Sequence, residues 1–559
     1  MKWCYLWVAT AWIGINAHAD NVTLASSNLP IILIHTDEAI NADAKVKGTM
    51  KIISNGEGQE NKVTDTPNDY DGWIGIKWRG ESSLNFNQKK YTIETRDAEG
   101  NDLAVSLLGM PEEADWVLLA PYNDVSMVRD VFAFYLWNQM GHWGPRTQMC
   151  EVVVNNEYMG VYALCESIKR DKNRVDISKL KPEDVEGRDV TGGYIVRIDA
   201  YDADDVTFTS KVKGIQKQQQ WGWSWGEAQN MEAPITWTIY YPKKEDLQPE
   251  QKEYIQKYVD ATELAIQAEN FDNPEEGYAQ YIDVSSFVDY FIHTELSLNA
   301  DGFKRSAYYY KEKDKKDGTR GKLFAGPVWD FNLAYGNCNF CNANNVRAWV
   351  YEGCETNPTP KMWKRLLEDK RFRAAVKQRY HELRKTILSE EAINQFLDSY
   401  AELLDQAKDR QFTKYKEVLK SSSSNNNPWG WGWGGGGTTY FAAYQVSSYA
   451  EEITTVKNWF HQRLQFLDEN LPGEDSSTAI CAPTYYDVDL QLCGCLLSIH
   501  SPKTIHRIDV VNAIGQPLLS HHIPNRNKAA INLMGFGHGL FVVVIYANDG
   551  SMVSRSVRL

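Results

Sequence analysis

The chain has 559 residues, of which 43% are hydrophobic, 12% aromatic and 24% charged, and its formal net charge at pH 7 is -15. This length exceeds what one hydrophobic core usually organises, so several structural units are expected. The acidic balance argues against nucleic acid as a partner, because proteins that follow a phosphate backbone concentrate Lys and Arg, although a local basic group and a cation can still hold ATP.

Residues 1–19 have the pattern of a signal peptide. Lys2 precedes an apolar run that ends at Ile15, and Ala17-His18-Ala19 offers small residues at the two positions that a signal peptidase inspects. A transmembrane anchor is the alternative, but the run is well short of the roughly 20 apolar residues that span a bilayer. We therefore expect export, a mature chain that begins near Asp20, and no transmembrane span in that mature chain.

The cysteines fit an exported protein. One of the nine lies in the predicted signal peptide, and the other eight are Cys150, Cys165, Cys338, Cys341, Cys354, Cys481, Cys493 and Cys495. An even number in an exported protein favours disulfides, although the sequence does not fix their connectivity. Cys338, Cys341 and Cys354 offer part of a zinc site as the alternative, but no fourth Cys or His lies close by.

Residues 29–95 are predicted to form β-strands. The apolar or alternating runs LPIILIH, VKGTMKII and WIGIKW are separated by polar connections rich in Asp, Asn and Gly. A turn with the sequence Arg79-Gly80-Glu81-Ser82-Ser83 follows, and alternation from Lys89 to Thr95 predicts the next strand. A lysine in a sheet beside such a turn can reach a phosphate as a flexible point charge, although most such lysines lie on a solvated strand face.

A helix is predicted over residues 127–143, because apolar residues recur there at helical spacing. A β-hairpin is predicted over residues 149–167, with Asn155-Asn156 as its turn. Glu166 follows the second strand of the hairpin, where a carboxylate either lies at a solvated strand end or partners a buried cation. The run GGYIVRID, residues 192–199, predicts a further strand.

Two segments are biased in composition. Residues near 210–235 include KGIQKQQQWGWSWGE, and residues 421–439 include NNNPWGWGWGGGG. Neither supports a packed core, so both are predicted to be loops or linkers, with stacking of Trp on a sugar or a base as the alternative. Amphipathic helices are predicted over residues 248–269, 284–298, 360–420 and 440–471, and short strands after residue 475 predict a small all-β module.

The stretch from Asn299 to Asn337 carries the candidate chemistry. Asp301 ends an apolar helical run, and Asp330 follows Val328-Trp329 after a strand-like segment and a charged turn. Two carboxylates at the ends of neighbouring elements suit metal-assisted transfer of a phosphoryl group. One can act as base toward a hydroxyl while the other holds a divalent cation on a phosphate, as in protein kinases.

Six ordered motifs resemble the spore coat protein H (CotH) kinase family over roughly residues 29–390. They are RGESS with Lys89-x-Tyr91, LLGMPEEADWVLLAPYNDVSMVRD, VVVNNEYMGVYALCE, GGYIVRID, Asn299-x-Asp301 and Val328-Trp329-Asp330. The resemblance implies an α+β fold, with a divergent protein-kinase-like two-lobed domain over residues 20–420, a closing helix within 440–474 and a small C-terminal β-sandwich. It also implies ATP and Mg²⁺ or Mn²⁺ as cofactors, and a protein substrate that bears Ser or Thr.

The resemblance assigns roles by position. Lys89 corresponds to the lysine that contacts the ATP phosphates, Glu166 to its ion-pair partner, Asp301 to the catalytic base and Asp330 to the metal ligand. Arg79 is a further candidate for cofactor binding. The neighbouring Lys90 points to the opposite face of the strand, so only one lysine can serve, and alignment on the Lys-x-Tyr motif favours Lys89.

Three positions depart from the expected pattern. Ser306 stands five residues beyond Asp301, where a kinase catalytic loop has a metal-binding Asn, so a second cation is held weakly by Ser306 or instead by Asn332. Asp130 stands where the family often shows Asn, and Gln88 replaces part of a Pro-Lys-Lys run. These departures leave open a catalytically weak or inactive kinase-like protein with a surface, adhesion or structural role.

Residues 475–559 resemble the C-terminal sorting domain of the type IX secretion system. The resemblance rests on DVVNAIGQPLL, GHGLFVVVIYANDG and the closing VSRSVRL. Together with the signal peptide it implies passage through the periplasm to the cell surface or the medium, with the type IX secretion machinery as a partner. An immunoglobulin-like spacer or binding domain is the alternative.

Overall fold

The computed structural model describes residues 22–56, 58–218, 230–420, 444, 446–473, 488–493, 496–512, 517–533, 539–547 and 552–558. The predicted signal peptide, the middle of the first Trp-rich segment and the segment 421–439 lie outside the described residues. None of the helices within these ranges combines the length and apolar character that crossing a membrane requires.

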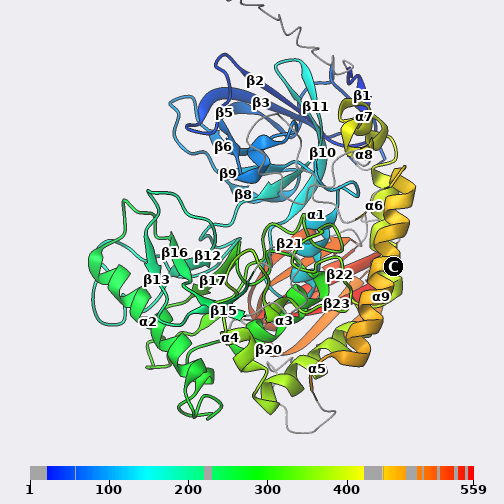
Figure 1. The fold of residues 1–559 in the computed structure, drawn as a ribbon. Coiled ribbons are helices and arrows are strands. Elements are labelled where there is room, and N and C mark those ends of the chain that lie inside the picture. The colour runs from blue at the N-terminus through cyan, green and yellow to red at the C-terminus, as the bar shows by residue number, and fades with distance from the viewer. Residues whose placement is uncertain are drawn as a thin grey trace, which may run out of the picture.

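A closed β-barrel forms the N-terminal part of the chain (Figure 1). Its strands follow the order β10-β11-β9-β6-β5-β3-β2, and β10 closes the barrel by pairing in parallel with β2. Alternation along the strands places Ile74, Ile76, Tyr91 and Ile93 in the barrel core, each at most 2% exposed. The barrel strands are β2 (Ile31–Thr36), β3 (Val46–Ile53), β5 (Tyr70–Arg79), β6 (Lys90–Arg96), β9 (Asp115–Leu119), β10 (Thr147–Val154) and β11 (Glu157–Glu166).

The predicted hairpin of residues 149–167 is confirmed as β10 and β11. Asn155 and Asn156 join them with φ of 49° and 67°, the left-handed conformation that a two-residue type I′ turn requires and that Asn tolerates. Short strand pairs flank the barrel or lie in the loops: β1 (Ser26–Ser27) with β4 (Asn61–Lys62), β7 (Val105–Leu107) with β8 (Met110–Glu113), and β14 (Gly214–Lys217) with β15 (Asn230–Ala233).

A second, five-stranded antiparallel sheet follows in the order β13-β16-β12-β17-β18. It packs with most of the helices around one large apolar core. The strands are β12 (Tyr194–Ile198), β13 (Thr207–Thr209), β16 (Thr236–Tyr241), β17 (Ala307–Lys311) and β18 (Leu323–Ala325).

Helices are confirmed in all the predicted stretches, with α1, α2 and α3 ending within a few residues of the expected positions. The stretch 360–420 contains five helices, α4 to α8, and the helix expected over 440–471 begins at Tyr449. Helix α9 lies beside α6 along one edge of the molecule (Figure 1). The α-helices are α1 (Arg129–Gln139), α2 (Pro249–Gln267), α3 (Val284–Ser297), α4 (Met362–Leu366), α5 (Lys370–Arg384), α6 (Glu390–Leu403), α7 (Ala407–Lys414), α8 (Glu417–Lys420) and α9 (Tyr449–Asn470). Short 3-10 helices are η1 (Ser82–Asn85), η2 (Tyr278–Gln280) and η3 (Val350–Glu352).

A separate sheet ends the chain. Strand β20 pairs with β19, β21 and β22, and β22 pairs with β23. The sheet has its own apolar core, which includes Ile505, Ile508, Val543 and Ile545. The chain is thus α+β with a C-terminal sheet region, whereas the sandwich form and the domain boundaries stay predictions. The strands are β19 (Asp489–Cys493), β20 (Leu496–Asn512), β21 (Pro517–Asn532), β22 (Leu540–Ala547) and β23 (Met552–Arg558).

The cysteines that the structure describes resolve the choice between a disulfide and zinc. Cys341 and Cys354 form a disulfide, so the two sulfur atoms are not thiolates and cannot bind zinc. Cys150, Cys165 and Cys338 are buried free thiols. The expectation of disulfides is confirmed for one pair.

Candidate active site

A cavity of about 360 Å³ is lined by β5, β6 and the turn between them on one side. The other side consists of the ends of β12 and β17 and of the segments that carry the candidate carboxylates. Five predicted site residues line this cavity, namely Arg79, Asp301, Ser306, Asp330 and Asn332. Lys89 and Glu166 do not line it.

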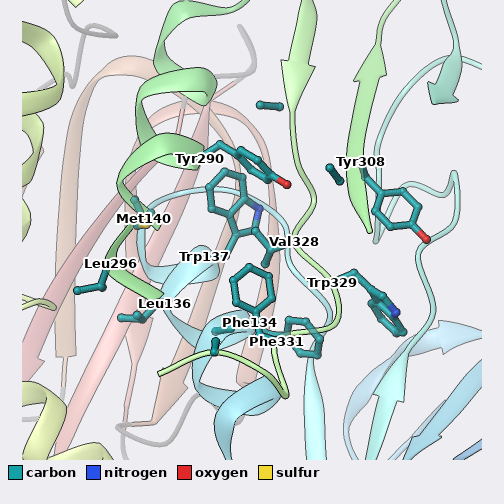
Figure 2. Close-up of a cluster of buried hydrophobic side chains, with 14 of the residues drawn as sticks. Phe134, Leu136, Trp137, Met140, Tyr290, Leu296, Tyr308, Val328, Trp329 and Phe331 are labelled. Atoms are coloured by element: carbon teal, nitrogen blue, oxygen red, sulfur yellow. The ribbon is translucent and has the colours of Figure 1, made fainter. Parts of the chain in front are cut away.

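Asp330 is aimed at the cavity by the packing of its neighbours. Val328 and Phe331 are 0% and 3% exposed, and Figure 2 shows both among buried aromatic side chains, with Trp329 at the edge of the cluster. Burial of these side chains leaves the carboxylate of Asp330 on the open side, where 38% of it is exposed. Its φ of 63° is left-handed, which Asp adopts more readily than most residues.

Asn299 joins the two segments that carry the carboxylates. Helix α3 ends at Ser297, and the left-handed φ of 46° at the following residue, Leu298, turns the chain out of the helix. The Nδ2 atom of Asn299 donates to the carbonyl oxygen of Asp330 at 3.2 Å, and its Oδ1 atom accepts from the backbone N–H of Asp301 at 3.2 Å. Asn299 is buried, so one side chain fixes the backbone of both candidate residues.

The carboxylates of the cavity form a group of like charge. Burial raises the pKa of Asp301 and of Asp199, and the nearby charge of Asp330 raises both further. Asp130 does not line the cavity but lies near Asp330, and burial, with a contribution from Asp330, raises its pKa to about 6. The Oδ1 atom of Asp130 accepts from the backbone N–H of Phe331 at 2.5 Å. A divalent cation would offset this mutual repulsion.

The barrel wall of the cavity carries two cations. Arg79 ends β5, Lys90 begins β6, and the register pairs the two directly, so their side chains share one face of the sheet. The Nζ atom of Lys90 lies 3.4 Å from Oδ1 of Asp330. The guanidinium of Arg79 lies over the Trp329 ring, 5.1 Å from its centroid, and forms no ion pair with any residue in the described ranges. Arg79 is therefore available to an anionic ligand.

Lys89 does not serve the cavity, in contrast to the preference that the sequence motif suggested. Its Nζ atom donates to the carbonyl oxygens of Leu84 and Phe86, both at 2.6 Å, and burial lowers its pKa. The alternation of side chains along a strand explains the placement. Tyr91 points into the barrel core, and Lys89, two residues before it, is directed to the same face, whereas Lys90 lies on the outer face. The sequence analysis weighed Lys90 and preferred Lys89, although the alternation of buried residues along this strand was a signal in favour of Lys90.

The predicted ion pair between Lys89 and Glu166 is wrong. Glu166 is fully buried and accepts from Nη2 and Nε of Arg146 at 2.7 and 2.9 Å. The Nε atom of Arg174 adds a second cation at 3.8 Å. The second hairpin strand, β11, therefore ends at Glu166, whose buried carboxylate is paired with Arg146 and Arg174. This ion pair is structural and lies outside the cavity.

Two further polar groups stand at the predicted metal position. The Nδ2 atom of Asn332 donates to Oδ1 of Asn123 at 3.0 Å, which leaves the side-chain oxygen of Asn332, Oδ1, for a cation. The Oγ atom of Ser306 lies 3.5 Å from Oδ1 of Asp199. Sequence reasoning missed Asp199, although it ends the strand of the GGYIVRID motif, and that strand pairs with the strand that follows Ser306.

A surface ion pair connects the two walls. Glu81 in the turn after β5 pairs with Arg305, four residues beyond Asp301, at 2.5 Å. The turn itself depends on Gly80, which has φ of 110° and whose Cβ, if present, would lie 1.9 Å from Oγ of Ser83. A glycine is thus required for the turn to lie against the cavity.

A sequence model of the CotH kinase protein family matches residues 76–467, well over half of the chain. The chain belongs to this family. All residues that line the cavity lie within the matched range. No curated protein gives a significant match to the chain.

Among solved structures, this CotH kinase family member is similar to a DUF3244 family protein from Bacteroides vulgatus with an immunoglobulin-like β-sandwich fold. The identity is 16%, and the match covers 13% of this chain and 82% of that one. Its TM-score of 0.12 gives no basis for comparing the two folds.

The donors in the cavity fit the divalent cation that kinase chemistry generally uses. Asp330, Asn332 and Asp199 offer oxygen atoms, which Mg²⁺ and Mn²⁺ prefer. Within the described part of the chain, no three carboxylates present oxygen atoms within 4.8 Å of one another. Mg²⁺ usually binds proteins through one or two carboxylates and completes its coordination with water and substrate phosphate.

Proposed function

We propose that this CotH kinase family protein is an exported kinase that transfers the γ-phosphate of ATP to a Ser or Thr hydroxyl of another protein, assisted by Mg²⁺ or Mn²⁺. One observation carries the proposal. Three charged groups converge on one cavity: the ammonium of Lys90, which contacts Asp330, the carboxylate of Asp301, and the guanidinium of Arg79, which has no ion pair within the described ranges. Phosphoryl transfer requires positioning and charge neutralisation more than covalent catalysis, and this cavity supplies both signs of charge.

The proposed role of each cavity residue follows from its charge. Lys90 and Arg79 bind phosphate oxygens, and they replace Lys89 in the role that the family resemblance gave to it. Asp330 and Asn332 hold the cation, with Ser306 near them. When bound, the cation neutralises charge that develops on the transferring phosphoryl group and the leaving ADP.

Asp301 accepts the proton of the acceptor hydroxyl as the hydroxyl oxygen bonds to the γ-phosphorus and the bond from that phosphorus to the ADP oxygen breaks. Burial raises the pKa of Asp301, which makes its carboxylate a stronger base than an exposed aspartate. Asn299 fixes the backbone of Asp301, so the carboxylate needs little reorganisation before it acts.

Export and surface localisation belong to the same proposal. The predicted signal peptide over residues 1–19 supports export, and so does the disulfide between Cys341 and Cys354, because disulfides persist in oxidising compartments. The resemblance of residues 475–559 to a type IX sorting domain supports a route through the periplasm to the surface or the medium. The acceptor is then a surface or secreted protein.

An inactive kinase-like surface protein is the second candidate. Ser306 favours it, because Ser306 stands where a kinase has an amide ligand and lies 3.5 Å from Asp199. ATP is also scarce outside cells. The same assay separates the two candidates, since nucleotide binding without transfer would indicate the inactive form.

The test is phosphotransfer by the purified mature protein with γ-labelled ATP, Mg²⁺ or Mn²⁺, and a fraction of exported proteins as acceptors. We expect label on protein with the wild type, and a loss of roughly 10³-fold or more with Asp330→Ala or Asp301→Ala. Asp43→Ala, at an exposed position outside the cavity, is the matched control and should behave as wild type. Equal transfer by all four proteins, or none by any, would overturn the proposal.

A further inference from the structure

A buried arginine connects the segment that follows Asp330 with a distant helix. Arg129 is the first residue of α1, is 1% exposed and does not line the cavity. Its Nε atom donates to the carbonyl oxygen of Ala334 at 3.1 Å, and its Nη2 atom lies 3.5 Å from that of Tyr335. One guanidinium therefore holds two consecutive carbonyls in the segment that carries the proposed metal ligands.

Helix α9 supplies a carboxylate to this arginine. The Nη1 atom of Arg129 contacts Oε1 of Glu452 at 2.7 Å and Oδ1 of Asp124 at 2.5 Å. Its Nη2 atom donates to the hydroxyl of Tyr444 at 2.6 Å, and that hydroxyl donates to the same Glu452 oxygen at 3.1 Å. Glu452 is 1% exposed, so the bridge from α9 to Arg129 is removed from solvent.

The segment 331–337 has no helix or strand of its own to fix it. Tyr335 within it has a left-handed φ of 51°, a conformation that costs a non-glycine residue free energy. Asp130 binds its first N–H group, and Asn123 accepts from Asn337 at 2.7 Å. Side chains of Arg129 and Asp130 and the backbone carbonyl of Asn123 thus hold this segment, together with the carbonyl oxygen of Ser297, which accepts from the N–H of Tyr335 at 2.8 Å. The Tyr335 ring packs directly against Trp459 and Phe460 of α9, and among the hydrogen bonds and ion pairs named here Arg129 adds the polar connection to α9.

We propose that Arg129 and Glu452 are positioning residues that set the orientation of Asp330 and Asn332 from outside the cavity. The proposal rests on the proposed function and adds a dependence on a helix about 120 residues further along the chain. Its physical basis is that a shift of about 1 Å in a reacting group can cost on the order of 100-fold in rate. Loss of the Glu452 charge leaves Asp124 as the one carboxylate in contact with Arg129 among the described residues, so the guanidinium moves toward Asp124 and its bonds to Ala334 and Tyr335 weaken.

The test compares Glu452→Gln with Glu469→Gln. Both substitutions make the same chemical change on α9, but Glu469 is exposed and lies near the C-terminal end of the helix. We measure kcat, the Mn²⁺ concentration that gives half-maximal transfer, and hydrogen exchange of the peptide that spans residues 328–337. For Glu452→Gln we expect a roughly tenfold lower kcat, a roughly tenfold higher Mn²⁺ requirement and faster exchange in that peptide. Glu469→Gln should match wild type in all three.

Tyr444→Phe is the milder second variant, because it removes one hydroxyl and leaves both charges in place. It should shift the same three quantities in the same direction by a smaller factor, about two- to threefold. A lower melting temperature of Glu452→Gln with an unchanged Mn²⁺ requirement, kcat and exchange rate would show a structural role only and would overturn the proposal. If the wild type transfers no phosphate, the proposed function fails, but exchange of residues 328–337 still decides whether Arg129 and Glu452 order this segment.

Discussion

The two walls of the cavity hold their charged groups by different means. Arg79 and Lys90 lie on the barrel wall at the ends of paired strands, where the hydrogen bonds of a closed barrel fix the backbone. Asp301 and Asp330 lie on the opposite wall, on segments without regular structure. The cations are therefore placed by strand register, whereas the carboxylates depend on a few buried polar side chains.

The opposite wall also contains several residues in strained conformations. A non-glycine residue with left-handed φ costs about 1 kcal/mol or more, so each one requires a compensating contact. Asn299 and the Arg129 bridge supply such contacts. We expect substitutions on the barrel wall to act locally and those on the opposite wall to affect both carboxylates together. Of the left-handed residues in these segments, Ser306 and Asp330 line the cavity, and Leu298, Phe303 and Tyr335 lie beside them in sequence.

The largest effect expected on the barrel wall is that of Lys90→Met. Loss of the ammonium removes a phosphate contact and leaves Asp330 without its partner, so we expect phosphotransfer to fall by roughly 10²- to 10³-fold. Lys89→Met is the matched control at the neighbouring position and should stay within about twofold of wild type in activity, because Lys89 binds carbonyls outside the cavity. Steady-state kinetics with labelled ATP measures both. A larger loss in Lys89→Met than in Lys90→Met would contradict the placement by register.

Much of the fold followed from sequence because its signals are local. Apolar or alternating runs predicted β2, β3, β5 and β6, but β9 was not predicted as a strand. Asn155-Asn156 predicted the hairpin turn, and helical spacing predicted α1, α2, α3 and α9. Closure of the barrel could not be predicted, because the parallel pairing of β10 with β2 joins strands more than 110 residues apart and carries no local pattern. A disulfide was expected, but which two cysteines form it could not be predicted, because the pairing depends on how the fold brings them together.

The candidate site residues that were predicted correctly are those that lie at the ends of helices or strands recognisable in the sequence. Asp301 and Asp330 end recognisable elements, so their positions in sequence marked them. The choice between Lys89 and Lys90 depended on which strand face is buried, and Tyr91 on the inner face decides it. Glu166 could not be assigned correctly, because its partner Arg146 is 20 residues away and the two meet only through the hairpin.

Asn299→Ala should give an intermediate effect on the opposite wall. It removes the bonds to the carbonyl of Asp330 and the N–H of Asp301, so we expect about a tenfold loss of kcat and about 1–3 kcal/mol of stability. Asn138→Ala is the control, because Asn138 makes hydrogen bonds of the same kind at the far end of α1. It should cost similar stability without loss of kcat. Equal kinetic losses in both variants would show that stability alone governs activity.

Asp130→Asn should have the smallest effect on activity and a distinct effect on stability. The pKa of Asp130 is about 6 in the folded chain, against an ordinary value of 3.8, because the group is buried and lies near the charge of Asp330. Between these two values the folded state binds more protons than the unfolded state, so the contribution of Asp130 to the free energy of unfolding falls as pH rises from about 4 to about 6. Asparagine carries no charge and can still accept from the N–H of Phe331.

We therefore expect Asp130→Asn to be more stable than wild type at pH 7, by about 1–3 kcal/mol, and the two proteins to converge near pH 4. Denaturant unfolding at several pH values measures this difference. Asp301 and Asp199 also have raised pKa values, but both are present in the two proteins, so the difference isolates Asp130. A gap that is independent of pH, or a variant less stable than wild type at pH 7, would mean that the carboxylate of Asp130 is stabilised by Lys90 more than burial and Asp330 oppose it. The carboxylate wall would then be balanced by the barrel wall across the cavity, and the two walls would not be independent.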